Sequence, residues 1–181
     1  MPRIAIPARE AAPAGSQGLL DGVAKQLGVV PNLFRLVSLS PAALEGYLGL
    51  YGALGKALDA KTRERIALAV AETNGCDYCL SAHSYLGLNL AKISQAEIDL
   101  NRAGRSSDPK AAAAVRFAAQ IARSRGHVSD ADLAAVRNAG YSDGQIVEIA
   151  GLVALNFLTN LVNNVAQTDI DFPVVRRAEA A

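Results

Sequence analysis

Helix start signals recur along almost the whole of this chain and leave little room for strands. At each one, a serine or aspartate either precedes a proline or lies three residues before a glutamate or glutamine, which are the arrangements of a helix N-cap and of a capping box. The signals are Ser40–Pro41, Ser94–Glu97, Asp108–Pro109 and Ser142–Gln145, with Ser129 as a further N-cap. We find no convincing strand pattern. We therefore predict an all-α fold in a single domain.

The predicted helices run from these caps to glycine, asparagine or proline stops, with apolar residues at helical spacing. They cover 18–28, 41–58, 60–74, 76 onward, 94–103, 109–126, 130–138 and 143–166. Residues 1–18 are rich in proline and glycine and are expected to form an extended N-terminal arm. We expect the helical domain to cover 19–170 and a C-terminal tail to cover 171–181.

Composition and charge narrow the classes of protein further. The chain is 51% apolar and has no tryptophan, which favours close-packed helices over a β-sandwich. The net charge is +1 with scattered lysines and arginines, so no basic stripe predicts a nucleic-acid partner. Polar residues interrupt the long apolar stretch over 146–166, and we expect a buried helix there rather than a membrane span. The N-terminal residues lack the apolar segment of a secretory signal, which favours the cytoplasm.

Both cysteines and one of the two histidines lie in the stretch NGCDYCLSAH, residues 74–83. Asn and Gly tolerate the left-handed conformation of a helix end, so Cys76, Cys79 and His83 are expected in the first turns of the next helix. At about 100° per residue these three side chains lie within roughly 60° of one another and share one stripe. In a cytoplasmic protein such a pair of cysteines is more often catalytic or metal-binding than a structural disulfide.

Three local features favour a thiolate in this cluster: the helix N-terminus, a partner thiol and a nearby imidazole. Cys76 is nearer the helix start, but Cys79 lies four residues from His83, the spacing at which helical side chains touch. We therefore predict Cys79 as the nucleophile and Asp77 as a helix cap. A third group should orient His83, and the spacing leaves both Glu64 and Glu72 as candidates.

Zinc is the other chemical interpretation of the cluster. A structural zinc site takes four ligands, and only the two thiols and one imidazole gather here. His127 follows Gly126 and would have to fold over to complete the site, whereas we expect it in a surface loop. The cysteines could also be buried small apolar residues. Both interpretations are weaker than a redox pair.

Three asparagines interrupt the last apolar helix. Asn156, Asn160 and Asn163 follow an i, i+4, i+7 pattern and therefore fall on one helical stripe. We interpret them as sources of helix–helix or subunit hydrogen bonds rather than as a ligand site. Glu72 is interpreted as a solvated or helix-pairing charge.

The segment LDAKTRERIALAVAETNGCDYCLSAHSYLG, residues 58–87, strongly resembles the core of the AhpD-like alkylhydroperoxidases of the carboxymuconolactone decarboxylase superfamily. The family pattern is a glutamate, eleven residues and then C-x-x-C-x-x-x-H. The spacing from Glu64 to Cys76 fits this pattern and selects Glu64 over Glu72. The stretches 28–41 and 133–166 are similar to the peroxidase-related branch of the family.

This resemblance implies an AhpD-like helical fold and a thiol-dependent peroxidase. In such an enzyme Glu64 and His83 would deprotonate Cys79, which would attack the peroxide, and Cys76 would resolve the sulfenic acid to a disulfide. No bound cofactor or metal is implied, and an external lipoamide-type dithiol would be the reductant. The partners would be a peroxide, this reductant and further copies of the chain in a dimer, trimer or hexamer, with no nucleic acid or membrane. Some members carry histidine where this chain has Tyr78, a possible accessory residue.

The same residues allow two alternatives. One is a dithiol–disulfide oxidoreductase that acts on protein or small-molecule disulfides. The other is a redox-sensing protein that does not turn over substrate. The decarboxylase activity in the superfamily's name is less expected, because that branch does not depend on a pair of cysteines.

Overall fold

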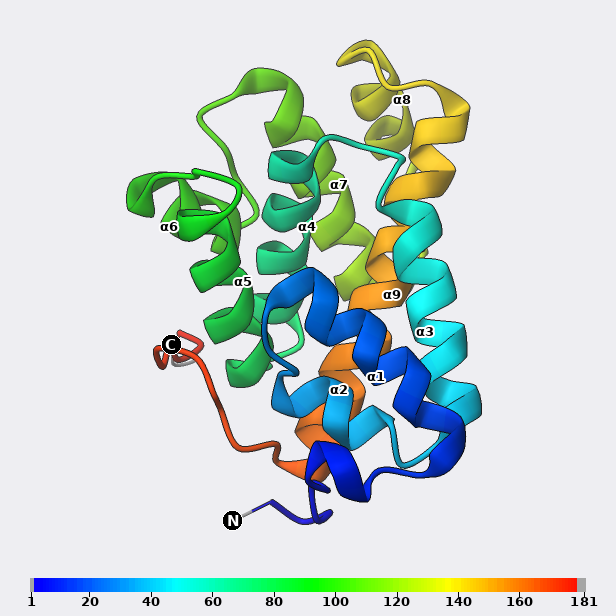
Figure 1. The fold of residues 1–181 in the computed structure, drawn as a ribbon. Helices are drawn as coiled ribbons and strands as arrows, with labels where there is room; N and C mark the ends of the chain where they lie inside the picture. Colours follow the sequence, from blue (N-terminus) through cyan, green and yellow to red (C-terminus); the bar gives the residue numbers. More distant parts are fainter. Residues whose placement is uncertain (1, 179–181) are drawn as a thin grey trace.

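A computed structural model of the protein describes residues 2–178 of the 181, and all regular structure in that range is helical (Figure 1). The predicted all-α fold is confirmed. In chain order the elements are the 3-10 helix η1 (Arg9–Ala11) and the α-helices α1 (Ala14–Leu27), α2 (Asn32–Val37), α3 (Pro41–Leu54), α4 (Ala60–Thr73), α5 (Asp77–Asn89), α6 (Gln95–Arg102), α7 (Pro109–Ser124), α8 (Asp130–Asn138) and α9 (Asp143–Ala166).

The predicted N-caps all accept backbone hydrogen bonds in their first turns. They are Ser40, Ser94, Asp108, Ser129 and Ser142. The capping box of Ser142 and Gln145 is complete. The one predicted from Ser94 and Glu97 is not: Ser94 accepts from the Glu97 amide, but the Glu97 side chain turns away from the helix start.

The N-terminal region is more helical than the sequence pattern predicts. The first long helix begins at Ala14 and not at residue 18, because Pro13 can stand at the N-cap and Leu20 and Val23 reach the core. Within the expected arm, η1 follows a short extended segment. The chain after Pro31 forms the additional short helix α2, which the sequence did not predict. Residue 1 of the expected arm lies outside the described residues.

Helix α4 lies at the centre of the fold, with α5, α6, α7 and α9 packed around it (Figure 1). Its residues from Ile66 to Ala71 are all buried, as expected for a helix that is covered on every side. Helices α1, α2 and α3 pack together as a second group. This group joins the rest of the fold where α3 contacts α9. The helices that carry the two halves of the Glu-and-cysteine motif, α4 and α5, are therefore in direct contact.

Helix α9 is 24 residues long, as predicted, and contacts α4, α7, α3 and α5. Among residues 2–178 it alone is long and apolar enough to cross a membrane by length and composition. Its most apolar stretch is 44% buried inside the protein. Core helices have the same pattern, and Ile149, Leu152 and Val153 of α9 belong to the main apolar cluster.

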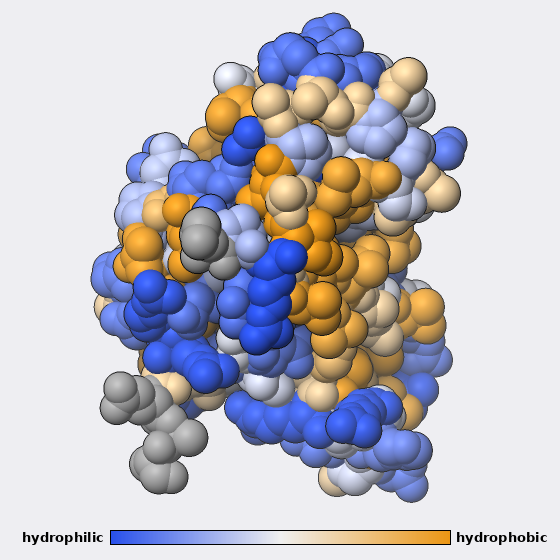
Figure 2. Space-filling view, turned by 90° about the horizontal axis from the view of Figure 1, so that it is seen from below, coloured by the Kyte–Doolittle hydropathy of each residue, from blue (hydrophilic) through white to orange (hydrophobic). Residues whose placement is uncertain are grey.

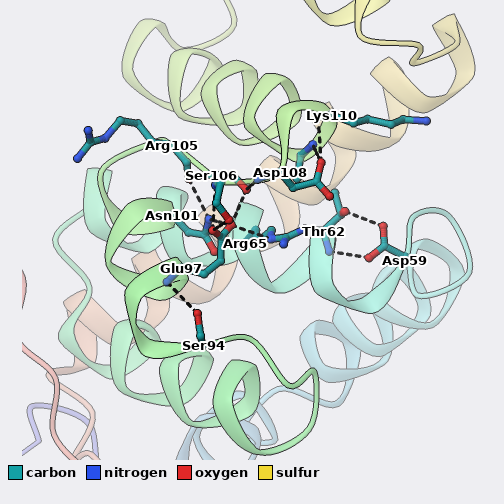
Figure 3. Close-up of polar contacts among 12 residues, drawn as sticks. Asp59, Thr62, Arg65, Ser94, Glu97, Asn101, Arg105, Ser106, Asp108 and Lys110 are labelled. Atoms are coloured by element: carbon teal, nitrogen blue, oxygen red, sulfur yellow. Dashed lines mark hydrogen bonds and ion pairs between the residues drawn. The ribbon is translucent and has the colours of Figure 1, made fainter.

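The Glu97 carboxylate is buried between α6 and the loop that leads to α7 (Figure 3). It accepts hydrogen bonds from Asn101, Ser106 and Ser107, and Arg65 of α4 lies 3.1 Å away as an ion-pair partner. These interactions replace the contact with the Ser94 amide that a capping box requires. The side chain thus fixes a loop to the central helix instead of capping its own.

After α9 the chain turns back along α5. Residues 169–178, which we name the C-terminal strap, contact α2, α4, α5 and α6 through hydrogen bonds. Phe172 packs edge-on against Tyr78, and the Val175 amide donates to the Ser81 hydroxyl. The expected tail over 171–181 is therefore ordered against the domain as far as residue 178, and its last three residues lie outside the described range.

Candidate functional site

The two cysteines lie at the start of α5, as predicted. Gly75 has the left-handed φ of 61° that lets the chain leave α4 and turn into the next helix. Cys76 is the N-cap of α5, and its sulfur accepts a hydrogen bond from the Cys79 amide at 3.3 Å. The sulfurs of these free cysteines are 2.6 Å apart, and the two residues are only 0% and 3% exposed. The pair is thus placed for thiol–disulfide chemistry in a dry environment.

Asp77 does not cap the helix as expected, because Cys76 occupies that position. Its carboxylate instead accepts hydrogen bonds from the Arg176 side chain and from the Arg177 amide of the C-terminal strap. These contacts direct its negative charge toward the strap. Burial acts to raise the pKa of Asp77, but the hydrogen bonds and charges of the strap outweigh it and lower that pKa.

His83 and Glu64 form the second part of the site. The Nδ1 atom of His83 lies 2.8 Å from Oε2 of Glu64, which joins α5 to α4. Both side chains are partly exposed, at 23% and 22%, so the site meets solvent at this end. Glu72, the other candidate, pairs instead with Arg102 on α6. The structure therefore brings Glu64 and not Glu72 to His83.

Electrostatics distinguish the two thiols. Burial acts to raise the pKa of Cys79, but the hydrogen bond from Cys76, the charge of His83 and the amide of Asn163 outweigh it and lower that pKa to about 7. The hydrogen bond to Cys79 and burial both raise the pKa of Cys76. Burial acts to lower the pKa of His83, but the Glu64 carboxylate raises it above its ordinary value. These opposite shifts favour ionisation of Cys79 over that of Cys76.

No hydrogen bond joins His83 to either sulfur within the described part of the chain. The imidazole acts on Cys79 through its charge, across less than two turns of α5. A proton could pass between them only if the contact tightened in a complex with substrate, which is common for catalytic groups.

Tyr78 lies between the cysteines in sequence but turns away from them. Its hydroxyl accepts from the Leu33 amide at 3.0 Å and donates to the Asp171 carboxylate at 2.8 Å. Burial raises the pKa of this phenol. Among residues 2–178 it makes no hydrogen bond to a thiol or to His83. Its geometry is that of an anchor between α2, α5 and the C-terminal strap.

Asn163 is a site residue that the sequence interpretation placed only at a helix interface. Its Nδ2 atom lies 3.3 Å from the Cys79 sulfur, across the contact between α9 and α5. Asn160, one turn earlier, accepts a hydrogen bond from the Asn74 amide group at 2.8 Å. Buried amides on an apolar helix require partners, and that requirement was the available signal.

The metal interpretation gains no support from the geometry. In the range 2–178 no group of three cysteine, histidine or acidic side chains is arranged to hold a metal ion. His127 lies exposed in the connection between α7 and α8, as predicted for a surface loop. His83 presents its Nδ1 atom to Glu64 and not to the sulfurs.

The model of the carboxymuconolactone decarboxylase family matches residues 41–124, which include Glu64, both cysteines and His83. The fold is similar to a solved structure from Ralstonia eutropha JMP134, described as an alkylhydroperoxidase AhpD core and an uncharacterized peroxidase-related protein. That similarity has a TM-score of 0.83 at 24% identity and covers 94% of this chain and 92% of that one. Residues 41–124 thus match the family that the sequence resembles, and the chain has the fold of an AhpD core.

Other relatives of this AhpD-like protein differ in what they are described to do. An uncharacterized peroxidase-related protein from Silicibacter sp. TM1040 has a TM-score of 0.79 at 23% identity and covers 93% of this chain and 91% of its own. The debrominase Bmp8, solved with 2,3,4-tribromopyrrole, has a TM-score of 0.77 at 20% identity and covers 91% of this chain and 89% of its own. The shared fold therefore accommodates more than one chemistry.

A curated relative from Haemophilus influenzae, described as an uncharacterized protein, is 56% identical over 46 residues. That match covers 24% of this AhpD-like chain and 41% of the relative. The chain thus spans about two fifths of the length of the curated relative that it matches. The likeness is local and assigns no activity.

Proposed function

We propose that this protein is a thiol-dependent peroxidase that reduces alkyl hydroperoxides, with Cys79 as the attacking thiol and Cys76 as the resolving thiol. The observation that carries the proposal is the Cys79 sulfur itself. It accepts a hydrogen bond from the Cys76 thiol, and the ion pair of His83 and Glu64 lies further along the same helix. A thiolate beside a second thiol is what reduction of a peroxide to a disulfide requires.

In the first step His83 takes the proton of the Cys79 thiol, with Glu64 stabilising the imidazolium. The thiolate attacks the terminal oxygen of a hydroperoxide ROOH. An S–O bond forms while the O–O bond breaks, which leaves Cys79 as a sulfenic acid and releases RO⁻. His83 then returns its proton to RO⁻, and the alcohol ROH departs.

In the second step the Cys76 sulfur attacks the sulfenic sulfur. An S–S bond forms, and the hydroxyl leaves as water with the proton of the Cys76 thiol. An external dithiol of the lipoamide type then reduces the disulfide in two exchange steps. The sum is one ROOH and one dithiol converted to one ROH, one water and one cyclic disulfide. No bound cofactor is needed.

The setting of this reaction is part of the same proposal. A pair of buried free thiols suits the reducing cytoplasm. The partners would be the peroxide, the dithiol reductant and further copies of the chain, and neither nucleic acid nor a membrane is required.

The test is a peroxide-consumption assay with cumene hydroperoxide and dihydrolipoamide as reductant. Wild type should turn over, and Cys79→Ser should be inactive. In the absence of the dithiol, Cys76→Ser should consume about one equivalent of peroxide and then stop as a sulfenic acid that dimedone labels. An inactive wild-type protein, or full activity in Cys79→Ser, would show that the proposal is wrong.

The role of Glu64 in the proton relay can be tested against a matched control substitution on the same helix. Glu64→Gln removes the carboxylate beside His83 and should lower kcat/KM about 100-fold. Glu72→Gln removes an equally ion-paired carboxylate of α4 that faces Arg102, and it should leave the activity near wild type. Equal effects of the two substitutions would contradict a relay through Glu64.

The same experiment distinguishes peroxidase activity from other activities of the same thiols. A dithiol–disulfide oxidoreductase would reduce a protein disulfide with dihydrolipoamide but would not consume peroxide. A redox sensor would lose both free thiols to peroxide without turnover. Release of bromide from 2,3,4-tribromopyrrole would indicate the chemistry for which the neighbour Bmp8 is named.

A further inference from the structure

The inner face of α9 brings two amide side chains toward the attacking sulfur. Asn163 is 3% exposed, and its Nδ2 atom lies 3.3 Å from the Cys79 sulfur. Its own Oδ1 atom is buried without a hydrogen-bond partner in the described chain. The Cys79 sulfur is thus the one hydrogen-bond partner that the described residues give to this buried amide, and this contact accounts for a polar side chain here.

Asn160 lies one turn before Asn163 on α9, and a residue outside the helix fixes its side chain. Asn74, at the end of α4, donates from its Nδ2 atom to Asn160 Oδ1 at 2.8 Å. This contact fixes the orientation of the Asn160 amide: its Oδ1 atom faces Asn74, and its NH₂ group is directed away from Asn74. Asn160 Nδ2 is buried without a hydrogen-bond partner among the described residues, and this amide acts with Asn163 to lower the pKa of Cys79.

The two cysteines differ in these donors. The Cys76 sulfur accepts only the backbone amide of Cys79, and no side-chain amide of the described residues reaches it. An N–H donor stabilises an anionic sulfur far more than a neutral one, so donors on one side of a cysteine pair decide where the negative charge stays. Amides also do not titrate, so their effect persists when His83 loses its proton.

We propose that Asn160 and Asn163 form an amide pair that holds the Cys79 sulfur as an anion and thereby selects it over Cys76 as the nucleophile. The inference deepens the proposed function, because it concerns the same sulfur, and it rests on that function for its meaning in catalysis. Both residues lie on α9, beyond the 41–124 span that matches the family.

Other groups around Cys79 also influence its ionisation, and they stay in place when the amides are changed. Cys76 and His83 act on it from the first turns of α5, and the Tyr47 and Tyr78 hydroxyls interact with it only through charge. Glu64 of α4 acts on it through His83. Helix α9 itself supplies amides and no charge at this point, so replacement of an α9 amide by leucine removes a hydrogen-bond donor without changing the local charge.

The experiment measures thiolate formation directly, without peroxide. In a Cys76→Ser background Cys79 is the sole thiol, and its ionisation is followed by absorbance at 240 nm and by the pH dependence of iodoacetamide alkylation. Asn163→Leu should lower the ratio of thiolate to thiol about tenfold at a given pH, and Asn160→Leu should lower it by a smaller factor. Asn163→Asp, which keeps the shape but places a carboxylate at the sulfur, should lower it further than Asn163→Leu.

Asn156→Leu is the matched control. Asn156 lies on the same stripe and is 7% exposed, but its amide donates to the Leu152 carbonyl within α9. It should leave the titration of Cys79 unchanged. Circular dichroism and thermal melting identify any variant that fails to fold, and the isosteric Asn163→Asp then carries the test.

The inference is overturned if folded Asn163→Leu or Asn163→Asp titrates like the parent, or if Asn156→Leu shifts the titration as much. These results do not depend on the peroxidase assignment. If the protein does not consume peroxide but its variants show the expected titration, the proposed function is wrong and the amide pair is supported. If the protein is a working peroxidase but the titration is unaltered in the Asn163 variants, the function is supported and the amide pair is wrong.

Discussion

Glu97 has four hydrogen bonds to its carboxylate, from Asn101, Ser106 and, twice, Ser107 (Figure 3). Burial acts to raise the pKa of Glu97, but the hydrogen bonds outweigh it and lower that pKa to about 2 from an ordinary 4.5. The folded state thus binds this proton more weakly than the unfolded chain does. The stabilisation is fully present above pH 4.5 and is lost as the pH falls through about 2.

Glu97→Gln should therefore lower the free energy of unfolding by about 2 kcal/mol at pH 7, because it removes the charge from these hydrogen bonds and from Arg65. The difference from wild type should shrink as the pH falls from 4.5 toward 2. Urea unfolding at pH 7, 5 and 3 measures it. The exposed Glu45→Gln is the control and should have little effect; a difference that grows in acid would contradict the assignment.

For single residues, the sequence predicts contacts within a motif better than contacts between distant parts of the fold. His83 and Glu64 meet because both belong to one spaced pattern on adjacent helices. Asn163 is 84 positions from Cys79, and its stripe on α9 indicated a buried partner without saying which one. For Glu97 the local capping pattern was misleading, since the more favourable partners come from a loop and from α4.

Among the elements, the C-terminal strap bears most directly on access to the thiols. Its Ile170, Phe172 and Val175 pack against the apolar cluster that contains both cysteines. The Tyr78 hydroxyl joins the strap to α2, since it contacts both Asp171 and the Leu33 amide. A reagent that approaches the buried cysteines from this side meets the strap.

Tyr78→Phe should loosen the strap, because it leaves the Leu33 amide and Asp171 without their shared partner. Loss of these two hydrogen bonds should raise the alkylation rate of the cysteines by a bulky maleimide about tenfold. Tyr85→Phe is the control, since Tyr85 also packs against Phe172 from α5 but its hydroxyl makes no hydrogen bond within the described residues. Equal rates in the two variants would show that the hydroxyl does not hold the strap.

Element boundaries followed the caps closely where the helices are long. The helices from α3 to α9 begin at or within a residue of their predicted starts, because an N-cap is a local interaction. The short η1 and α2 were missed, since three to six residues are too few to show a helical period. The strap was expected as a tail, because its order depends on partners in four other elements.

The molecule as a whole exposes an apolar surface along its longest helix. Leu158, Leu161 and Val165 are exposed on the C-terminal half of α9, and Leu50 and Tyr51 are exposed on the neighbouring α3. Figure 2, which views the protein from the end where α9 finishes, shows a broad apolar area between polar margins. Surfaces of this kind are usually covered by another protein. We propose that a second copy of this chain covers it.

Leu161→Glu should then lower the mass of the particle in solution, because it places a charge in the centre of the buried contact. Size-exclusion chromatography with light scattering at about 10 µM and 100 µM protein measures the mass. Leu90→Glu, at the exposed end of α5, is the control and should leave the mass unchanged. A wild-type protein that is monomeric at both concentrations would refute the assembly.

The C-terminal strap also has a consequence for the order of synthesis. It follows every helix along the chain, so it leaves the ribosome after α1 to α9 have been made. Domains fold progressively during translation, and the helices can pack before the strap arrives. Until residues 169–178 emerge, Cys76 and Cys79 lack this part of their cover. We therefore expect the two thiols of a newly made chain to react with thiol reagents more readily until the strap has packed against them.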